Sequence, residues 1–115
     1  MQLLDWGKAL ARLNGNEALL QEMAAIFCEE CPELMANIQE AITQGEAPEL
    51  RRAAHTLKGE ADIFIAKPVA DTASRLESIG REGNLAEAED AWLALKDTMA
   101  RLLPALREAA KMPGT

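Results

Sequence analysis

Apolar residues in this chain recur every three or four positions, and this spacing limits the fold more than any other feature of the sequence. Along residues 85–109 the series comprises Leu85, Ala88, Trp92, Leu95, Met99, Leu102, Leu106 and Ala109. A helix turns once in about 3.6 residues, so these side chains share one helix face. No stretch shows the two-residue alternation of a half-buried strand, and the chain has one valine and no tyrosine. The sequence therefore predicts an all-α protein.

Capping residues and helix breakers divide the chain into five predicted helices, over residues 5–14, 16–44, 48–64, 67–83 and 84–109. Asp5, Asn16 and Asn84 are residue types that cap helix N-termini, and Gly45 and Gly83 suit helix C-termini. The predicted inner stripe of the second helix comprises Leu19, Met23, Ile26, Phe27, Cys31, Leu34, Ile38 and Ile42. Four amphipathic helices with short connections predict an antiparallel four-helix bundle, to which the short first helix is an addition at one end.

The length of 115 residues suits a single domain over residues 1–115, with 112–115 as a frayed end or linker remnant. No apolar run approaches the roughly 18 residues that a membrane span needs, and no secretory signal is recognisable. We therefore expect a cytoplasmic domain that does not itself contact a membrane. The cytosolic end of a membrane-bound protein is a second location compatible with this expectation. The net charge of -7 argues against nucleic acid as a partner.

Cys28 and Cys31 have the C-x-x-C spacing of redox pairs and of half-sites for zinc. The pair lies within a predicted helix, and the chain has neither a second cysteine pair nor a second histidine. One chain therefore cannot supply four zinc ligands. We interpret the cysteines as small, partly buried helix residues and expect no metal site.

The single histidine, His55, lies on the polar face of the third predicted helix. That face comprises Arg51, Arg52, His55, Lys58, Gly59 and Asp62, whereas Leu50, Ala54, Leu57, Ala61 and Phe64 lie on the opposite face. Lys58 places a cation one turn from the imidazole, and Gly59 leaves open space at a cost of roughly 1 kcal/mol in helix propensity. The face combines a nucleophile, a cation and clearance, although exposed histidines and arginines are also ordinary content of a solvated helix.

Several strings of residues accompany this histidine: HTLKG at 55–59, LDW at 4–6, FCEECPEL at 27–34 and RLE at 75–77. Together with five predicted helices in a small acidic chain, they resemble the histidine phosphotransfer (HPt) domains of bacterial phosphorelays. The resemblance covers nearly the whole chain. The opening of the first helix is most similar to the C-terminal module of a hybrid sensor histidine kinase.

The resemblance implies that His55 accepts a phosphoryl group from an aspartyl phosphate on a response-regulator receiver domain and passes it to another receiver. Lys58 would balance the added negative charge, and Gly59 would let the receiver approach. By position, Glu77 on the next helix would hydrogen-bond the other ring nitrogen. No cofactor is implied for this chain, because Mg²⁺ would belong to the receiver.

The polar face of the third helix also suggests how a receiver would dock. Arg51 and Arg52 make the surface around the histidine locally positive within an acidic protein, and Asp62 lies two turns beyond the histidine. We expect these three residues to contact the receiver and the domain to be monomeric. No glycine-rich nucleotide loop is recognisable, so ATP-dependent kinase activity is not expected of this chain.

The chain departs from the HPt pattern after Gly59, where small residues and then a glycine usually follow. Glu60 and Asp62 stand among the small positions, and Ile65 stands where the glycine is expected. The departures are compatible with altered partner choice or with weaker transfer. Two other readings stay open: an inert helical adaptor or dimerisation bundle, and the N-terminal phosphoacceptor module of a chemotaxis-type kinase.

Overall fold

The computed structural model describes residues 2–111, which form helices and no strands. The elements are α1 (Trp6–Arg12), α2 (Glu17–Gln44), α3 (Ala47–Ile63), α4 (Lys67–Glu82), the short 3₁₀ helix η1 (Leu85–Glu87) and α5 (Ala88–Ala109). The predicted all-α class is confirmed for this part of the chain. The tail predicted at 112–115 lies outside the described residues.

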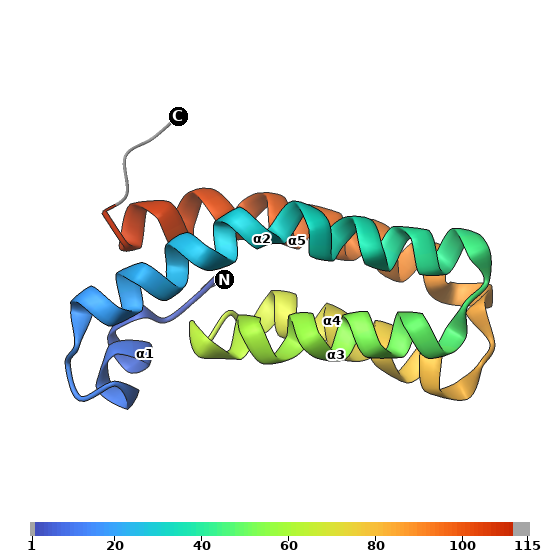
Figure 1. Cartoon of the computed structure of the whole chain (residues 1–115), viewed down its shortest axis with the longest axis horizontal. Helices are drawn as coiled ribbons and strands as arrows, with labels where there is room; N and C mark the ends of the chain where they lie inside the picture. The colour runs from blue at the N-terminus through green and yellow to red at the C-terminus, as the bar shows by residue number, and fades with distance from the viewer. Residues whose placement is uncertain (1, 112–115) are drawn as a thin grey trace.

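The four long helices pack as an antiparallel bundle. In Figure 1, α2 and α5 run along one side and α3 and α4 along the other, while α1 lies at one end. Each long helix contacts two of the others: α2 packs on α3 and α5, and α4 packs on α3 and α5. The predicted bundle with an additional short helix is therefore confirmed. None of the described helices is both long and apolar enough to cross a membrane.

Polar caps and glycines set the ends of the helices, as the sequence predicts. The Asp5 carboxylate accepts a hydrogen bond from the Lys8 amide, and the Asn16 side chain accepts one from the Leu19 amide. Gly45 adopts the left-handed conformation that ends α2. The Asp5 amide also donates to the carbonyl of Phe64 at 3.0 Å, so the start of α1 is tied to the end of α3.

The fifth helix begins later than predicted. The Asn84 side chain accepts a hydrogen bond from the Ala86 amide and caps η1, whereas α5 starts at Ala88. Tight 3₁₀ turns often precede α-helices, and they share the three-residue spacing that Leu85 and Ala88 show. The apolar pattern therefore cannot separate the two kinds of turn.

The predicted inner stripe of α2 is partly wrong, because Leu19 and Ile26 are exposed. The buried residues of α2 are Leu20, Ala24, Phe27, Cys31, Ile38 and Ala41. Leu19 and Leu20 are both apolar and lie about 100° apart around the helix, so only one of them can point at the core. The predicted stripe of eight residues is wider than the face of α2 that the neighbouring helices bury.

The close approach of α3 and α4 depends on Gly80. A Cβ atom at Gly80 would lie 2.7 Å from the backbone nitrogen of Arg51 and 2.8 Å from the carbonyl oxygen of Ala47. Real Cβ atoms do not come so near to backbone atoms, so only glycine fits between these helices. Gly80 follows Glu77 by one turn, and Arg51 precedes His55 by one turn. This contact therefore sets the distance between the two helices close to His55.

Ile65, which stands where the HPt resemblance expects a glycine, has the backbone of a glycine. Its φ is +53°, in the left-handed region that β-branched residues rarely adopt. The following amide, of Ala66, donates to the carbonyl of Ala61 at 3.0 Å and closes the end of α3. Ile65 thus adopts the turn conformation expected of a glycine, at a conformational cost of about 1–2 kcal/mol.

Candidate functional site

His55 projects from the middle of α3 and forms a hydrogen bond with α4. Its side chain is 66% exposed, and its Nδ1 lies 2.8 Å from Oε2 of Glu77. The Glu77 side chain is only 7% exposed. The imidazole is thus held at one edge by a buried carboxylate and is open to solvent elsewhere.

Two cations accompany the Glu77 carboxylate. Lys58 Nζ donates to Oε1 at 2.9 Å, and the Arg81 guanidinium lies 3.7 Å from Oε2. The hydrogen bond from Lys58, more than the one from His55, holds the pKa of Glu77 below its ordinary value against the opposing effect of burial. Glu77 is therefore an ionised carboxylate near neutral pH.

The ionised carboxylate fixes which ring nitrogen of His55 carries a proton. A carboxylate can only accept hydrogen bonds, so Nδ1 must donate and carry the hydrogen. In a neutral imidazole the other nitrogen, Nε2, then holds a free lone pair. The site consequently presents one oriented, exposed nitrogen nucleophile.

A cleft lined by Pro48, Arg51, Arg52, His55 and Glu77 opens beside the imidazole. Both arginines are exposed, so the predicted positive surface lies next to His55. The guanidinium of Arg52 also pairs with Glu49 at 2.9 Å, whereas no ion pair is found for Arg51 within residues 2–111.

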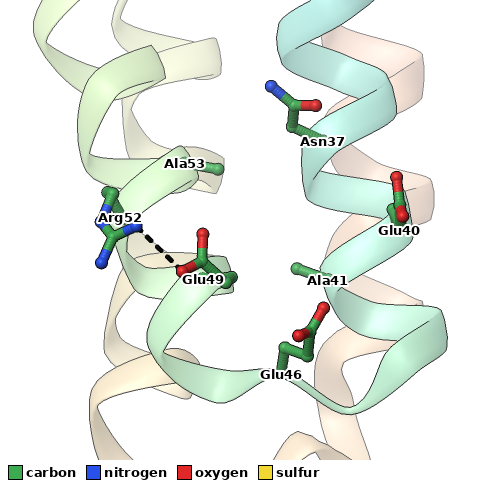
Figure 2. Close-up of a pocket in the computed structure, with 7 residues that line it drawn as sticks. All are labelled: Asn37, Glu40, Ala41, Glu46, Glu49, Arg52 and Ala53. Carbon is green, nitrogen blue, oxygen red and sulfur yellow. Dashed lines mark hydrogen bonds and ion pairs between the residues drawn. The ribbon is translucent and has the colours of Figure 1, made fainter.

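A second cleft, between the end of α2 and the start of α3, lies on the other side of Arg52. Figure 2 shows the pair between Arg52 and Glu49 in this cleft, together with Glu40, Glu46 and the apolar Ala41. The side chains that line it include no histidine, cysteine or hydroxyl group. This cleft therefore lacks a nucleophile of the kind found at His55.

Gly59 faces open space, as the sequence predicts. A Cβ atom at this position would meet no neighbouring atom within 4 Å, so the glycine is not needed for packing inside the domain. Together with Asp62 and Met23, it lines a surface hollow between α1, α2 and α3. The guanidinium of Arg12 donates to the carbonyl of Asp62 at 3.2 Å. Asp62 thus lies beside a cation on the α1 side, whereas Glu77 approaches His55 from α4.

An apolar patch adjoins this hollow. It comprises Leu19, Met23 and Ile26 of α2, which share one side of that helix, and Ile63 of α3. Leu19 and Ile26 are 41% and 46% exposed. Sequence reasoning missed this patch because it assigned all three α2 residues to the core. The width of the predicted stripe could have indicated the patch, because eight apolar positions span more of the helix surface than one buried face occupies.

Glu60, next to Gly59, occupies an unusual position. Its Oε2 atom is buried without a hydrogen-bond donor among the described residues. Burial, and secondarily the charge of Glu30, raise the pKa of Glu60 above its ordinary value. Glu60 therefore carries its negative charge at a cost to the folded state.

We expect Glu60→Gln to raise the melting temperature at pH 7. A raised pKa in the folded state means that ionisation destabilises the fold, and this penalty is absent below the unfolded pKa. The difference between variant and wild type should therefore shrink as the pH falls below about 4.5, the ordinary value. Thermal unfolding followed by circular dichroism from pH 3 to 8 measures both quantities. A variant less stable than wild type at pH 7 would contradict the assignment.

The two cysteines are partly or fully buried helix residues, as the sequence predicts. Cys28 is half-buried, Cys31 is buried, and neither forms a disulfide. Burial raises the pKa of Cys31 to about 11, so its thiol stays protonated and unreactive near neutral pH. Within residues 2–111, no cluster of three or more potential metal ligands occurs.

Arg81 is the residue near His55 that sequence reasoning missed. It follows Glu77 by four residues, a spacing at which side chains on one helix meet, and this spacing could have indicated the pair. The structure brings together the residues that were predicted around the imidazole: Lys58 and His55 both contact the carboxylate of Glu77.

Comparisons with known proteins agree with the resemblance noted in the sequence. The family model of the Hpt domain matches residues 22–105, well over half of the chain. No match was found among curated proteins.

Two solved structures share the fold. Histidine-containing phosphotransfer protein B (HptB) from Pseudomonas aeruginosa PAO1 is 24% identical, with a TM-score of 0.85 and 95% of each chain covered. The HPT domain of a sensor hybrid histidine kinase from Shewanella is 21% identical, with a TM-score of 0.80 and 98% of this chain and 97% of that chain covered.

Proposed function

Since the chain belongs to the Hpt domain family, whose function is histidine phosphotransfer in phosphorelays, we propose that His55 is its phosphoacceptor. In this proposal His55 takes a phosphoryl group from an aspartyl phosphate on one receiver domain and passes it to an aspartate on another. The observation that carries the proposal is the oriented imidazole, whose side chain is 66% exposed and which is bonded through Nδ1 to the buried carboxylate of Glu77.

The proposed transfer conserves atoms and charge. The lone pair of Nε2 attacks phosphorus, a nitrogen–phosphorus bond forms, and the bond from phosphorus to the aspartyl oxygen breaks. The aspartate leaves as a carboxylate, so no proton has to be supplied to it. The ring becomes more positive during attack, and the Glu77 carboxylate at Nδ1 offsets this charge while retaining its hydrogen bond. The second transfer is the same step in reverse, onto another aspartate.

Lys58 is suited to support the phosphoryl group. It follows His55 by three residues, which places it on the same side of α3, and its side chain is 34% exposed. Its ammonium can turn from Glu77 toward phosphoryl oxygens without leaving the site. Arg51 adds a second cation at the cleft beside the ring.

The surface around Gly59 suits the approach of a receiver. The open space over Gly59 lets a partner's backbone come near α3, and the apolar patch beside it offers surface that is buried on docking. We therefore assign receiver docking to the apolar patch together with Asp62, Arg51 and Arg52. The last three alone do not account for the exposed Leu19 and Ile26.

Phosphotransfer to His55→Gln tests this proposal. Receiver domains from the same organism are phosphorylated with a radiolabelled small phosphodonor, then mixed with wild-type protein or with the variant. We expect wild type to acquire label that is acid-labile and alkali-stable, as a phosphohistidine is, and the variant to acquire none. Circular dichroism confirms that the exposed substitution leaves the fold intact.

The outcomes separate the candidate functions. Equal labelling of His55→Gln would place the phosphoryl group on another residue. If no receiver of the organism labels wild type, the inert adaptor is favoured. Labelling of wild type by ATP and an isolated kinase domain, but by no receiver, would favour the module of a chemotaxis-type kinase.

Lys58→Ala is expected to slow transfer about 10- to 100-fold. A charge-assisted hydrogen bond contributes roughly 1.5–3 kcal/mol, and each 1.4 kcal/mol corresponds to a factor of ten. Single-turnover labelling measures the rate. Lys96→Ala, which removes an exposed lysine of α5, is the matched control and should transfer as wild type does. Equal rates for both variants would remove Lys58 from the phosphoryl site.

A further inference from the structure

A shallow groove between α2 and α3 contains a single charged side chain. It is lined by Met23, Ile26, Phe27, Glu60, Ile63 and Phe64. Five of these residues are apolar, and Glu60 supplies the only charge. The groove is separate from the cleft at His55, whose lining shares no residue with it.

Among residues 2–111, no cation forms an ion pair with the carboxylate of Glu60. Its buried Oε2 receives no hydrogen bond from these residues. The charge that raises its pKa is that of Glu30, which is also negative. A buried acceptor without a donor destabilises a folded protein. The groove thus contains a hydrogen-bond acceptor, Oε2 of Glu60, that no donor within residues 2–111 satisfies.

The groove continues into the proposed docking surface. Met23 and Ile63 line both the groove and the hollow that contains Gly59. Glu60 is also the residue directly after Gly59. A protein seated over Gly59 therefore covers the mouth of the groove.

We propose that this groove accepts a lysine or arginine side chain of the docked receiver and so selects among receivers. The inference rests on the proposed function, because it takes the occupant from the receiver surface. The apolar walls match the methylene stem of such a side chain, and the carboxylate of Glu60 matches its charged end. An aspartate or glutamate is repelled here, and an aliphatic side chain leaves Oε2 of Glu60 without a donor.

Small probes test the chemistry of the groove without a receiver. The ¹⁵N-labelled full chain is titrated with n-butylammonium and, separately, with 1-butanol, which has the same stem but no charge. We expect n-butylammonium to give saturable shifts in the amides of Met23, Ile26 and Ile63, and 1-butanol to bind at least fivefold more weakly. Equal binding of the two probes would overturn the proposal.

Two charge-matched variants make the test specific to the groove. Glu60→Gln should weaken n-butylammonium binding at least fivefold and leave 1-butanol binding unchanged. Glu40→Gln removes the same charge in the second cleft, the acidic cleft between the end of α2 and the start of α3. This variant should bind both probes as wild type does. Unchanged affinity in Glu60→Gln, or shifts confined to the acidic cleft, would also overturn the proposal.

The partner protein provides the second readout. With a receiver that labels wild type, Glu60→Gln should raise the receiver concentration for half-maximal transfer while the rate at saturation stays the same. An unchanged concentration would show that the receiver does not use the groove. Failure of the proposed function is distinct, because it would abolish transfer to wild type and leave the probe titrations as they are.

Discussion

Gly80→Ala is expected to destabilise the domain by about 1–3 kcal/mol, because among the glycines of residues 2–111 it is the one where an added Cβ comes closest to its neighbours. The added Cβ would meet the backbone of Arg51 and the carbonyl of Ala47 at less than 3 Å. Backbone atoms cannot rotate away as a side chain can, so α3 and α4 have to move apart. Denaturant titration followed by circular dichroism measures the loss.

The same substitution should also slow phosphotransfer, because the displaced α4 carries Glu77. We expect the rate in the folded population to fall along with the stability. The matched control is Gly59→Ala on α3, which meets no neighbouring atom and should gain about 1 kcal/mol in helix propensity. If both alanine variants had the same stability, α3 and α4 would not approach each other as closely at Gly80 as described.

Gly59→Leu is expected to reduce transfer from a receiver about 10- to 100-fold while the fold is kept or stabilised. The side chain projects into open space in the free domain, so the domain has no internal clash to relieve. The clash arises only when a partner approaches, and roughly 1.4–2.8 kcal/mol of lost binding corresponds to that factor. Rates measured over a range of receiver concentrations should show a loss of affinity.

Gly59→Ala separates the two possible causes of this effect. It gains helix propensity as leucine does but adds only one methyl group, so we expect transfer close to that of wild type. Slow transfer in both variants would trace the effect to the loss of glycine itself. Normal transfer in both would mean that no partner approaches α3 at this position.

Features that depend on one helix alone could be predicted from the sequence. The spacing of residues fixes their angles around a helix, so the shared face of His55, Lys58 and Gly59 followed directly. The opposite face of α3, from Leu50 to Phe64, is buried as predicted. Resemblance to a family then added Glu77, which no spacing rule connects to His55.

Features that depend on contacts between helices could not be predicted in this way. The 2.8 Å contact of Glu77 with His55 requires a particular offset between α3 and α4, which the contact at Gly80 sets. Whether Leu19 or Leu20 faces the core depends on how α2 is rotated against its neighbouring helices. Likewise, the unpartnered Oε2 of Glu60 is known only once every neighbour has been placed.

The sharing of Glu77 between His55 and Lys58 bears on the equilibrium of the relay. In the proposed transfer, a phosphoryl group on His55 competes with Glu77 for the ammonium of Lys58, because that carboxylate already binds it at 2.9 Å. The competition limits how strongly the phosphorylated form is stabilised. In the proposed relay, a phosphohistidine with only a share of Lys58 is less stable than one that holds this lysine alone, which favours onward transfer to the next aspartate.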